Sequence, residues 1–83
     1  MPTVFRWKKY RFFFYSNEGK PQEPIHIHVE KGKAEAEAAF WVGSFVHLKE
    51  NYGMKDHELT EIKKQITKNK KRIIEVWNEH FSQ

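Results

Sequence analysis

The feature that most constrains the fold is a change in the spacing of apolar residues along the chain. In residues 3–15, 23–30 and 34–42 the side chains follow a period of two, which is the period of a β-strand. From residue 56 onward apolar residues recur three, four or seven positions apart, as on one face of an amphipathic helix. Because the strand pattern comes first and the helical pattern last, the sequence predicts an α+β fold and not alternating βαβ units.

The first alternating stretch, residues 3–15, predicts a hairpin with Lys8-Lys9 as its turn. In that register Trp7 faces Tyr10 and Phe5 faces Phe12. An aromatic stripe then falls on one face and is expected to enter the core: Phe5, Trp7, Tyr10, Phe12 and Phe14. The opposite face is expected to carry Val4, Arg6, Arg11, Phe13 and Tyr15.

A second hairpin is predicted from residues 23–30 and 34–42, joined by a turn near Gly32. With Lys31-Gly32 as the turn, position 28 faces 35 and position 26 faces 37. With Gly32-Lys33, position 28 faces 37 and position 26 faces 39. In both registers the histidines share a face with two glutamates, and the other face is apolar. The residues on the shared face are His26, His28, Glu35 and Glu37.

The remaining segments complete one domain of 83 residues. Residues 16–24 are polar with Gly and two prolines, which indicates a loop. Residues 44–48 are predicted to form a short fifth strand or an irregular crossing. Residues 51–54 are predicted to form a turn. We therefore expect a sheet of four to five strands in residues 1–48. Asp56 is the predicted N-cap of a helical tail over residues 56–82, either one long helix or two shorter ones that break near Asn69. Its apolar stripe is Leu59, Ile62, Ile66, Ile73, Ile74, Trp77 and Phe81.

Composition narrows the class of protein. The chain has no cysteine, so disulfides and cysteine-ligated zinc are excluded. No stretch approaches the roughly 18 consecutive apolar residues of a membrane-spanning helix. The opening residues lack a basic segment followed by an apolar one, so we expect a cytoplasmic protein without a membrane partner.

Positive charge is concentrated in two places within a net charge of +4. Near the C-terminus basic residues occur without an acidic one, and a smaller basic set lies in the first hairpin. Such segments suit a phosphate backbone or an acidic protein partner, and a solvated helix face gives the same pattern. The candidate partner-binding or nucleic-acid-binding residues are Arg6, Arg11, Lys63, Lys64, Lys68, Lys70, Lys71 and Arg72.

The histidine pair admits three interpretations. His26 and His28 could act as general acid and base on RNA, oriented by Glu35 and Glu37. They could bind zinc, with Glu35, Glu37 or His47 as a further ligand, although neither a metal nor another cofactor is required by the sequence. They could also be structural, hydrogen-bonded to the facing glutamates. The sequence leaves open whether the protein is an enzyme.

Several motifs resemble a small prokaryotic family called domain of unknown function 4160. Members open with Met-Pro-Thr, continue with an aromatic strand and Ser-Asn-(Asp/Glu), and carry Pro-Pro-His-x-His-Val before a tail with Asn-(Lys/Arg) and Trp-Asn. The matching residues are Met1-Pro2-Thr3, Ser16-Asn17-Glu18, Pro24 to Val29, Asn69-Lys70 and Trp77-Asn78. Ile25 stands where the family has its second proline. The family has no assigned activity. The resemblance implies that the gene neighbours that of another small uncharacterised protein, an arrangement similar to a toxin–antitoxin pair.

We therefore expect a small basic interaction module that binds a small protein partner in a toxin–antitoxin-like pair, or another copy of itself. The alternatives are an RNA-binding protein or ribonuclease that uses His26 and His28, and a zinc-binding protein that uses the same pair.

Overall fold

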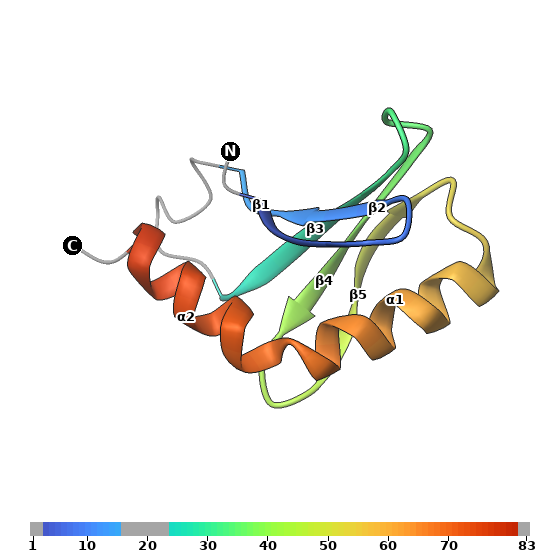
Figure 1. The fold of residues 1–83 in the computed structure, drawn as a ribbon. Helices are drawn as coiled ribbons and strands as arrows, with labels where there is room; N and C mark the ends of the chain where they lie inside the picture. Colours follow the sequence, from blue (N-terminus) through green and yellow to red (C-terminus); the bar gives the residue numbers. More distant parts are fainter. Residues whose placement is uncertain (1–2, 16–23, 82–83) are drawn as a thin grey trace.

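The computed structural model of the protein describes residues 3–15 and 24–81, and the predicted loop at Ser16–Glu23 lies outside this range. A five-stranded antiparallel sheet, with its strands in chain order, is followed by two helices (Figure 1). The predicted α+β fold is confirmed. The strands are β1 (Thr3–Trp7), β2 (Tyr10–Phe13), β3 (His26–Lys31), β4 (Ala36–Val42) and β5 (Val46–Tyr52). The helices are α1 (Asp56–Lys68) and α2 (Lys70–Phe81).

The first hairpin has the predicted register. Trp7 pairs with Tyr10 and Phe5 with Phe12, across a two-residue turn. The ring centroids of Phe5 and Phe12 lie 4.2 Å apart in a stacked arrangement. The prediction for Val4 is wrong, because the register of β1 shifts between Thr3 and Phe5. This irregularity adds one residue to the strand locally, and Val4 is buried in the core instead of on the opposite face.

The fifth strand is longer than expected. It reaches Tyr52 and pairs along β4, so the sheet does not end at residue 48 and residues 51–52 are strand. The predicted turn is confined to the two residues that follow, Gly53 and Met54. There the side-chain oxygen Oδ1 of Asn51 accepts a 2.9 Å hydrogen bond from the backbone N–H of Met54. The side-chain nitrogen Nδ2 of Asn51 donates to the Met54 carbonyl.

The helical tail consists of two helices that meet at Asn69. The side chain of Asn69 donates a 2.8 Å hydrogen bond to the carbonyl of Gln65, and its backbone N–H caps the same end of α1. The predicted N-cap is wrong by one position, because Lys55 is the N-cap and Asp56 the first helical residue. No helix among the described residues is long and apolar enough to cross a membrane.

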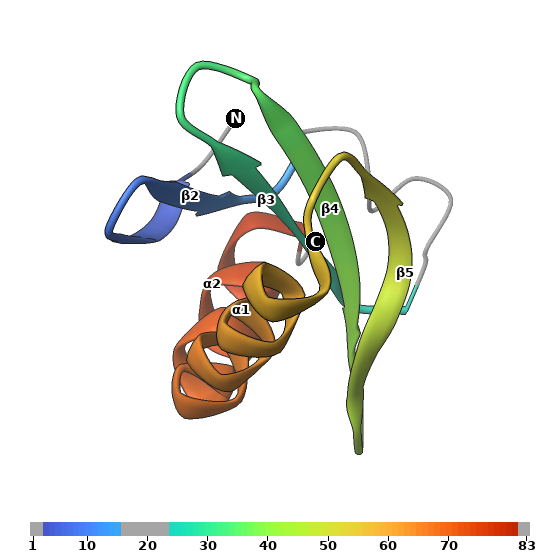
Figure 2. The same cartoon turned by 90° about the vertical axis from the view of Figure 1, so that its right-hand side faces the viewer.

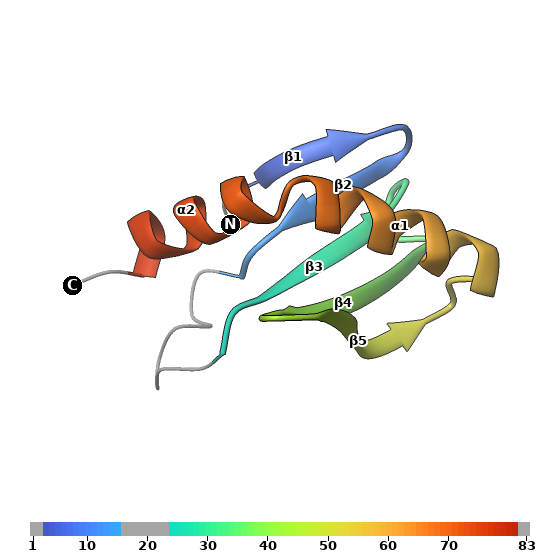
Figure 3. The ribbon, with the colours of Figure 1, turned by 90° about the horizontal axis from the view of Figure 1, so that it is seen from below.

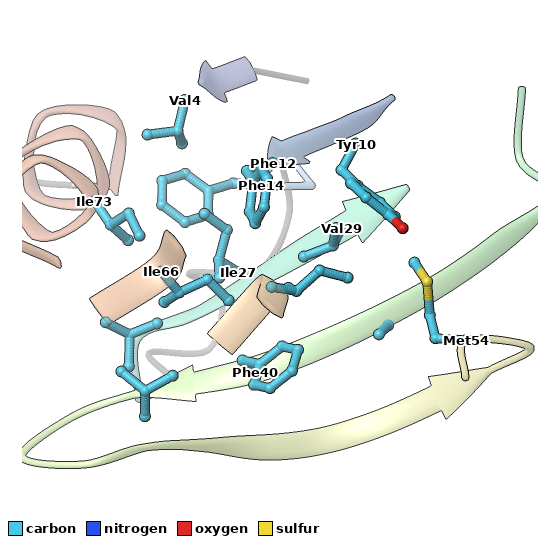
Figure 4. Packing of buried hydrophobic residues seen from close by; sticks show 14 of the residues in the cluster. Val4, Tyr10, Phe12, Phe14, Ile27, Val29, Phe40, Met54, Ile66 and Ile73 are labelled. Atoms are coloured by element: carbon cyan, nitrogen blue, oxygen red, sulfur yellow. The ribbon is translucent and has the colours of Figure 1, made fainter. Parts of the chain in front are cut away.

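Both helices lie on one side of the sheet (Figure 2), and together they run across its strands (Figure 3). The core forms between them from the alternating strand residues and the helical stripe (Figure 4). Burial of this apolar surface is the main favourable term in folding a domain of this size. Fully buried core side chains include Phe12, Phe14, Ile27, Val29, Ile62, Ile66 and Ile73.

Candidate functional site

The predicted sharing of one face by the histidines and Glu37 is confirmed, but the register of the second hairpin is not. His28 pairs with Ala39, His26 with Trp41, and Glu30 with Glu37. The turn contains four residues, Gly32–Glu35, and not two. A four-residue turn moves the pairing by two positions relative to the Gly32-Lys33 turn, and a shift of two leaves every side chain on the same face.

Glu35 is therefore not opposite a histidine. It lies at the end of the turn, where its backbone N–H donates to the Lys31 carbonyl at 2.9 Å. The turn also uses left-handed backbone at Gly32 (φ 57°) and Ala34 (φ 62°), the latter a conformation that sequence patterns rarely predict for alanine. The proposed orienting role of Glu35 has no geometric basis in this register.

His28 lies in a polar and aromatic environment on the sheet face that carries Phe13 and Glu37. Glu37 reaches it diagonally, with Oε2 at 3.5 Å from Nδ1. The same carboxylate oxygen accepts a 3.0 Å hydrogen bond from the Tyr15 hydroxyl. The His28 ring also contacts Tyr15 and Phe13, with centroids 4.5 and 5.6 Å away. Only 5% of His28 is exposed.

His26 is even less accessible, at 2% exposed. Its Nδ1 lies 3.0 Å from the Pro24 carbonyl oxygen, and since a carbonyl can only accept, this nitrogen donates. The ring lies between two tryptophans, with centroids 5.4 Å from Trp41 and 5.5 Å from Trp77. Trp77 belongs to α2, so His26 connects the start of β3 to the C-terminal helix.

The two imidazoles are neighbours, with centroids 5.5 Å apart, but both are enclosed by protein. The described residues contain no group of three or more His, Cys, Asp and Glu side chains placed to hold a metal ion. His47 pairs with Trp41 from β5 and is exposed. This arrangement favours the structural interpretation of the pair over acid–base chemistry on a large substrate.

We expect His26→Ala to lower the free energy of unfolding by about 2 kcal/mol, because it removes a ring that packs between Trp41 and Trp77. Urea denaturation would measure this, with the exposed His57→Ala as the control, which should change stability by less than about 0.5 kcal/mol. A variant with unchanged stability but lost cleavage of a generic RNA would contradict the structural interpretation.

The basic residues of the first hairpin differ in availability. Arg6 and Arg11 face each other across β1 and β2, and Arg6 is exposed. The Arg11 guanidinium is held by Glu30 on β3 at 2.8 Å, and it lies 4.1 Å from the centroid of the Phe13 ring. Glu30 thus offsets the repulsion between the facing arginines. Because Arg11 already contacts Glu30 and Phe13, it is less available to bind a partner.

The six basic residues of the helical tail lie on the other side of the sheet from Arg11. Two of them make contacts with the sheet region: Lys70 Nζ donates to the Ser44 carbonyl at 3.3 Å, and Arg72 Nε donates to the Val4 carbonyl at 3.4 Å. Lys64 lies 3.4 Å from Glu61. The predicted cations therefore form two separate groups. Those that are exposed on the helices are Lys63, Lys64, Lys68, Lys71 and Arg72.

A buried carboxylate that the sequence did not reveal joins the sheet to the start of α1. Glu58 is 5% exposed and accepts a 2.6 Å hydrogen bond from the Tyr10 hydroxyl. Lys31 Nζ lies 2.8 Å from the same oxygen, and the backbone N–H of Lys55 donates to the other one at 3.0 Å. These donors lower the Glu58 pKa to about 2, with Lys31 as the largest cause. Burial, followed by the neighbouring carboxylate, raises the pKa of Tyr10 to about 12.

Glu58 has an evident structural role, because it connects β2, β3 and the first turn of α1. Its position three residues after the N-cap is the only local signal, since Glu at that position commonly accepts from the N-cap N–H. The contacts with Tyr10 and Lys31 depend on packing between distant segments, which no spacing in the sequence specifies.

The fold and site define a small α+β domain, an antiparallel sheet covered on one side by two helices and containing a buried histidine pair. A family model described as Domain of unknown function (DUF4160) matches residues 10–78. The chain belongs to this family, as its motifs had indicated. No curated protein and no solved structure matches the chain.

Proposed function

We propose that this protein is a small interaction module that binds a protein partner by adding a strand of that partner to β5. The observation that carries the proposal is the exposure of large hydrophobic side chains along this edge of the sheet. Leu48 is 43% exposed and Tyr52 is 65% exposed. An edge strand presents unpaired backbone groups, and exposed apolar side chains beside them supply specificity for an added strand.

The opposite edge of the sheet, β1, exposes less apolar surface to an added strand. The large apolar side chains of β1, Phe5 and Trp7, are partly buried against the core. On β5, the charge of Lys49 does not protect the edge, because its ammonium lies over the Trp41 ring at 5.3 Å and 3.7 Å from Glu50. A partner strand is therefore better accommodated at β5.

The toxin–antitoxin-like arrangement suggested by the family resemblance would supply the partner. We place both proteins in the bacterial cytoplasm and expect the partner to be the small product of the neighbouring gene. A second copy of this chain is the alternative occupant of the same edge. The mass of this protein measured without the partner distinguishes the two, because a dimer would show that a second copy binds there.

We expect the wild-type protein to form a complex with the neighbouring gene product at micromolar concentration, and the double variant Leu48→Glu/Tyr52→Glu to lose it. Two carboxylates at the edge would repel an added strand and be desolvated by it. Size-exclusion chromatography with light scattering measures the masses. The charge-matched control is Thr60→Glu/Thr67→Glu on the exposed surface of α1, which should keep the complex. Independent elution of the two wild-type proteins would reject the proposal.

A second function is favoured by a separate observation, the exposed basic side chains on α1 and α2. We propose that they give sequence-independent affinity for nucleic acid, through release of counterions from the phosphates. A ribonuclease that uses His26 and His28 finds less support, because both rings are buried. Zinc binding by the same pair lacks a third ligand among the described side chains.

A further inference from the structure

An open cleft of about 320 Å³ lies at the end of the sheet where β4 turns into β5. Its aromatic walls are Trp41, which is partly exposed, and Phe45, which is 80% exposed in the turn. His47 and Ser44 add polar groups. The volume falls within the range of small-ligand pockets, roughly 300–1,000 Å³. A phenylalanine ring this exposed contributes little to folding and is available for a ligand.

One basic residue of the helical tail reaches the turn that forms part of the cleft. The hydrogen bond from Lys70 Nζ to the Ser44 carbonyl, at 3.3 Å, joins the kink between α1 and α2 to the turn between β4 and β5. Figure 1 shows this turn below the kink. Lys49 Nζ lies 5.3 Å from the centroid of the Trp41 ring and 3.7 Å from Glu50 Oε1. Two cations from different elements thus each contact a residue that lines the cleft.

The aromatic lining of the cleft and the lysines near it indicate which kind of ligand would bind. The residues that line it include aromatic, small and apolar side chains and one histidine, with no carboxylate among those the structure describes. Aromatic rings bind the faces of unpaired bases, and lysines beside them bind the phosphates between bases. A base inside a duplex has both faces stacked, so such a site distinguishes single strands from duplexes.

We propose that this cleft binds an unpaired base of a single-stranded nucleic acid. Phe45 and Trp41 contact the base, while Lys70 and Lys49 contact the adjoining phosphates. The proposal rests on the nucleic-acid affinity of the basic helices and adds to it a preference for single strands. Sequence preference is weak, because every base has a stacking face.

Fluorescence anisotropy with a labelled oligouridylate and a labelled duplex of equal length, at low and moderate salt, tests this. We expect Phe45→Ala to weaken oligouridylate binding roughly tenfold, since stacking on one aromatic ring is worth about that factor, and to leave duplex binding unchanged. His57→Ala is the control, because it removes an exposed ring from the first turn of α1 and His57 does not line the cleft. It should change neither affinity.

A second pair of variants tests the phosphate contact. Lys70→Gln should weaken oligouridylate binding and reduce its salt dependence, whereas Lys33→Gln, at the turn between β3 and β4, should do neither. Thermal melts confirm that each variant is folded.

The outcomes separate the cleft from the basic helices. If the wild type binds single strands and duplex equally, and Phe45→Ala binds as the wild type does, the cleft proposal is overturned while the electrostatic affinity stands. If neither nucleic acid binds at low salt, both fail. If Phe45→Ala keeps its oligouridylate affinity but loses the protein partner, Phe45 belongs to the protein interface and the cleft proposal is overturned.

Discussion

Replacing Phe12 with alanine is expected to lower the free energy of unfolding by about 4 kcal/mol. Phe12 has no exposed surface, lies on the second strand of the sheet and stacks on Phe5. A domain of 83 residues has a total stability of roughly 4–12 kcal/mol, so this single change removes a third or more of it. Urea denaturation followed by tryptophan fluorescence gives the difference.

Phe45→Ala is the matched control, because it removes the same ring from a site that is 80% exposed. Its effect on stability should stay within about 0.5 kcal/mol. Equal losses from the two variants would contradict the burial assigned to these rings, and would mean that the core is not organised around the first hairpin.

Glu58→Gln should cost about 2 kcal/mol at neutral pH, since it keeps the shape of the side chain but removes the charge that three donors share. The same substitution should change the response to acid. The Glu58 pKa falls from 4.5 to about 2 on folding. A lowered pKa contributes stability above the unfolded value and loses it as the pH falls, so the wild type should lose stability between about pH 4.5 and 2.

The unfolding free energy of Glu58→Gln should therefore fall less steeply than that of the wild type in this window. Urea denaturation at a series of pH values measures both slopes. If the unfolding free energies of the two proteins fall equally steeply with acid, folding does not lower the Glu58 pKa.

Tyr10→Phe is an internal control for this network, because it acts at the opposite end of the pH scale. The Tyr10 pKa rises from 10 to about 12 on folding, so its contribution is present below pH 10 and is lost as the pH rises toward 12. The variant should lack this alkaline loss and keep a reduced acid loss, because Lys31 and the Lys55 N–H still lower the Glu58 pKa.

Local periodicity predicted much of the fold. The aromatic alternation placed Phe12 and Phe14 in the core, and the helical stripe placed Ile62, Ile66 and Ile73 against them. From Phe5 to Phe12 the register of the first hairpin was predicted correctly, because its two-residue turn fixes it, whereas the irregularity beside Val4 was missed. The second was not, because four residues including Ala34 in left-handed backbone form the turn, and nothing in an Ala/Glu repeat marks that length.

The candidate site divides in the same way. The sequence determined that His26, His28 and Glu37 share a sheet face, because alternation survives any even shift of register. Tertiary structure decided what surrounds them: His26 is enclosed by Trp41 and by Trp77, which α2 brings from the far end of the chain.

Contacts between distant segments also decided the roles of the charged residues. Glu58 is buried with Tyr10 and Lys31 because α1 crosses the sheet where those strands lie, and Lys70 reaches Ser44 because the kink at Asn69 brings α2 to the turn between β4 and β5. Periodicity specifies which face of an element is apolar, since that depends only on neighbouring residues. Which elements meet, and at which residues, depends on how those faces pack together, and this the sequence pattern does not contain.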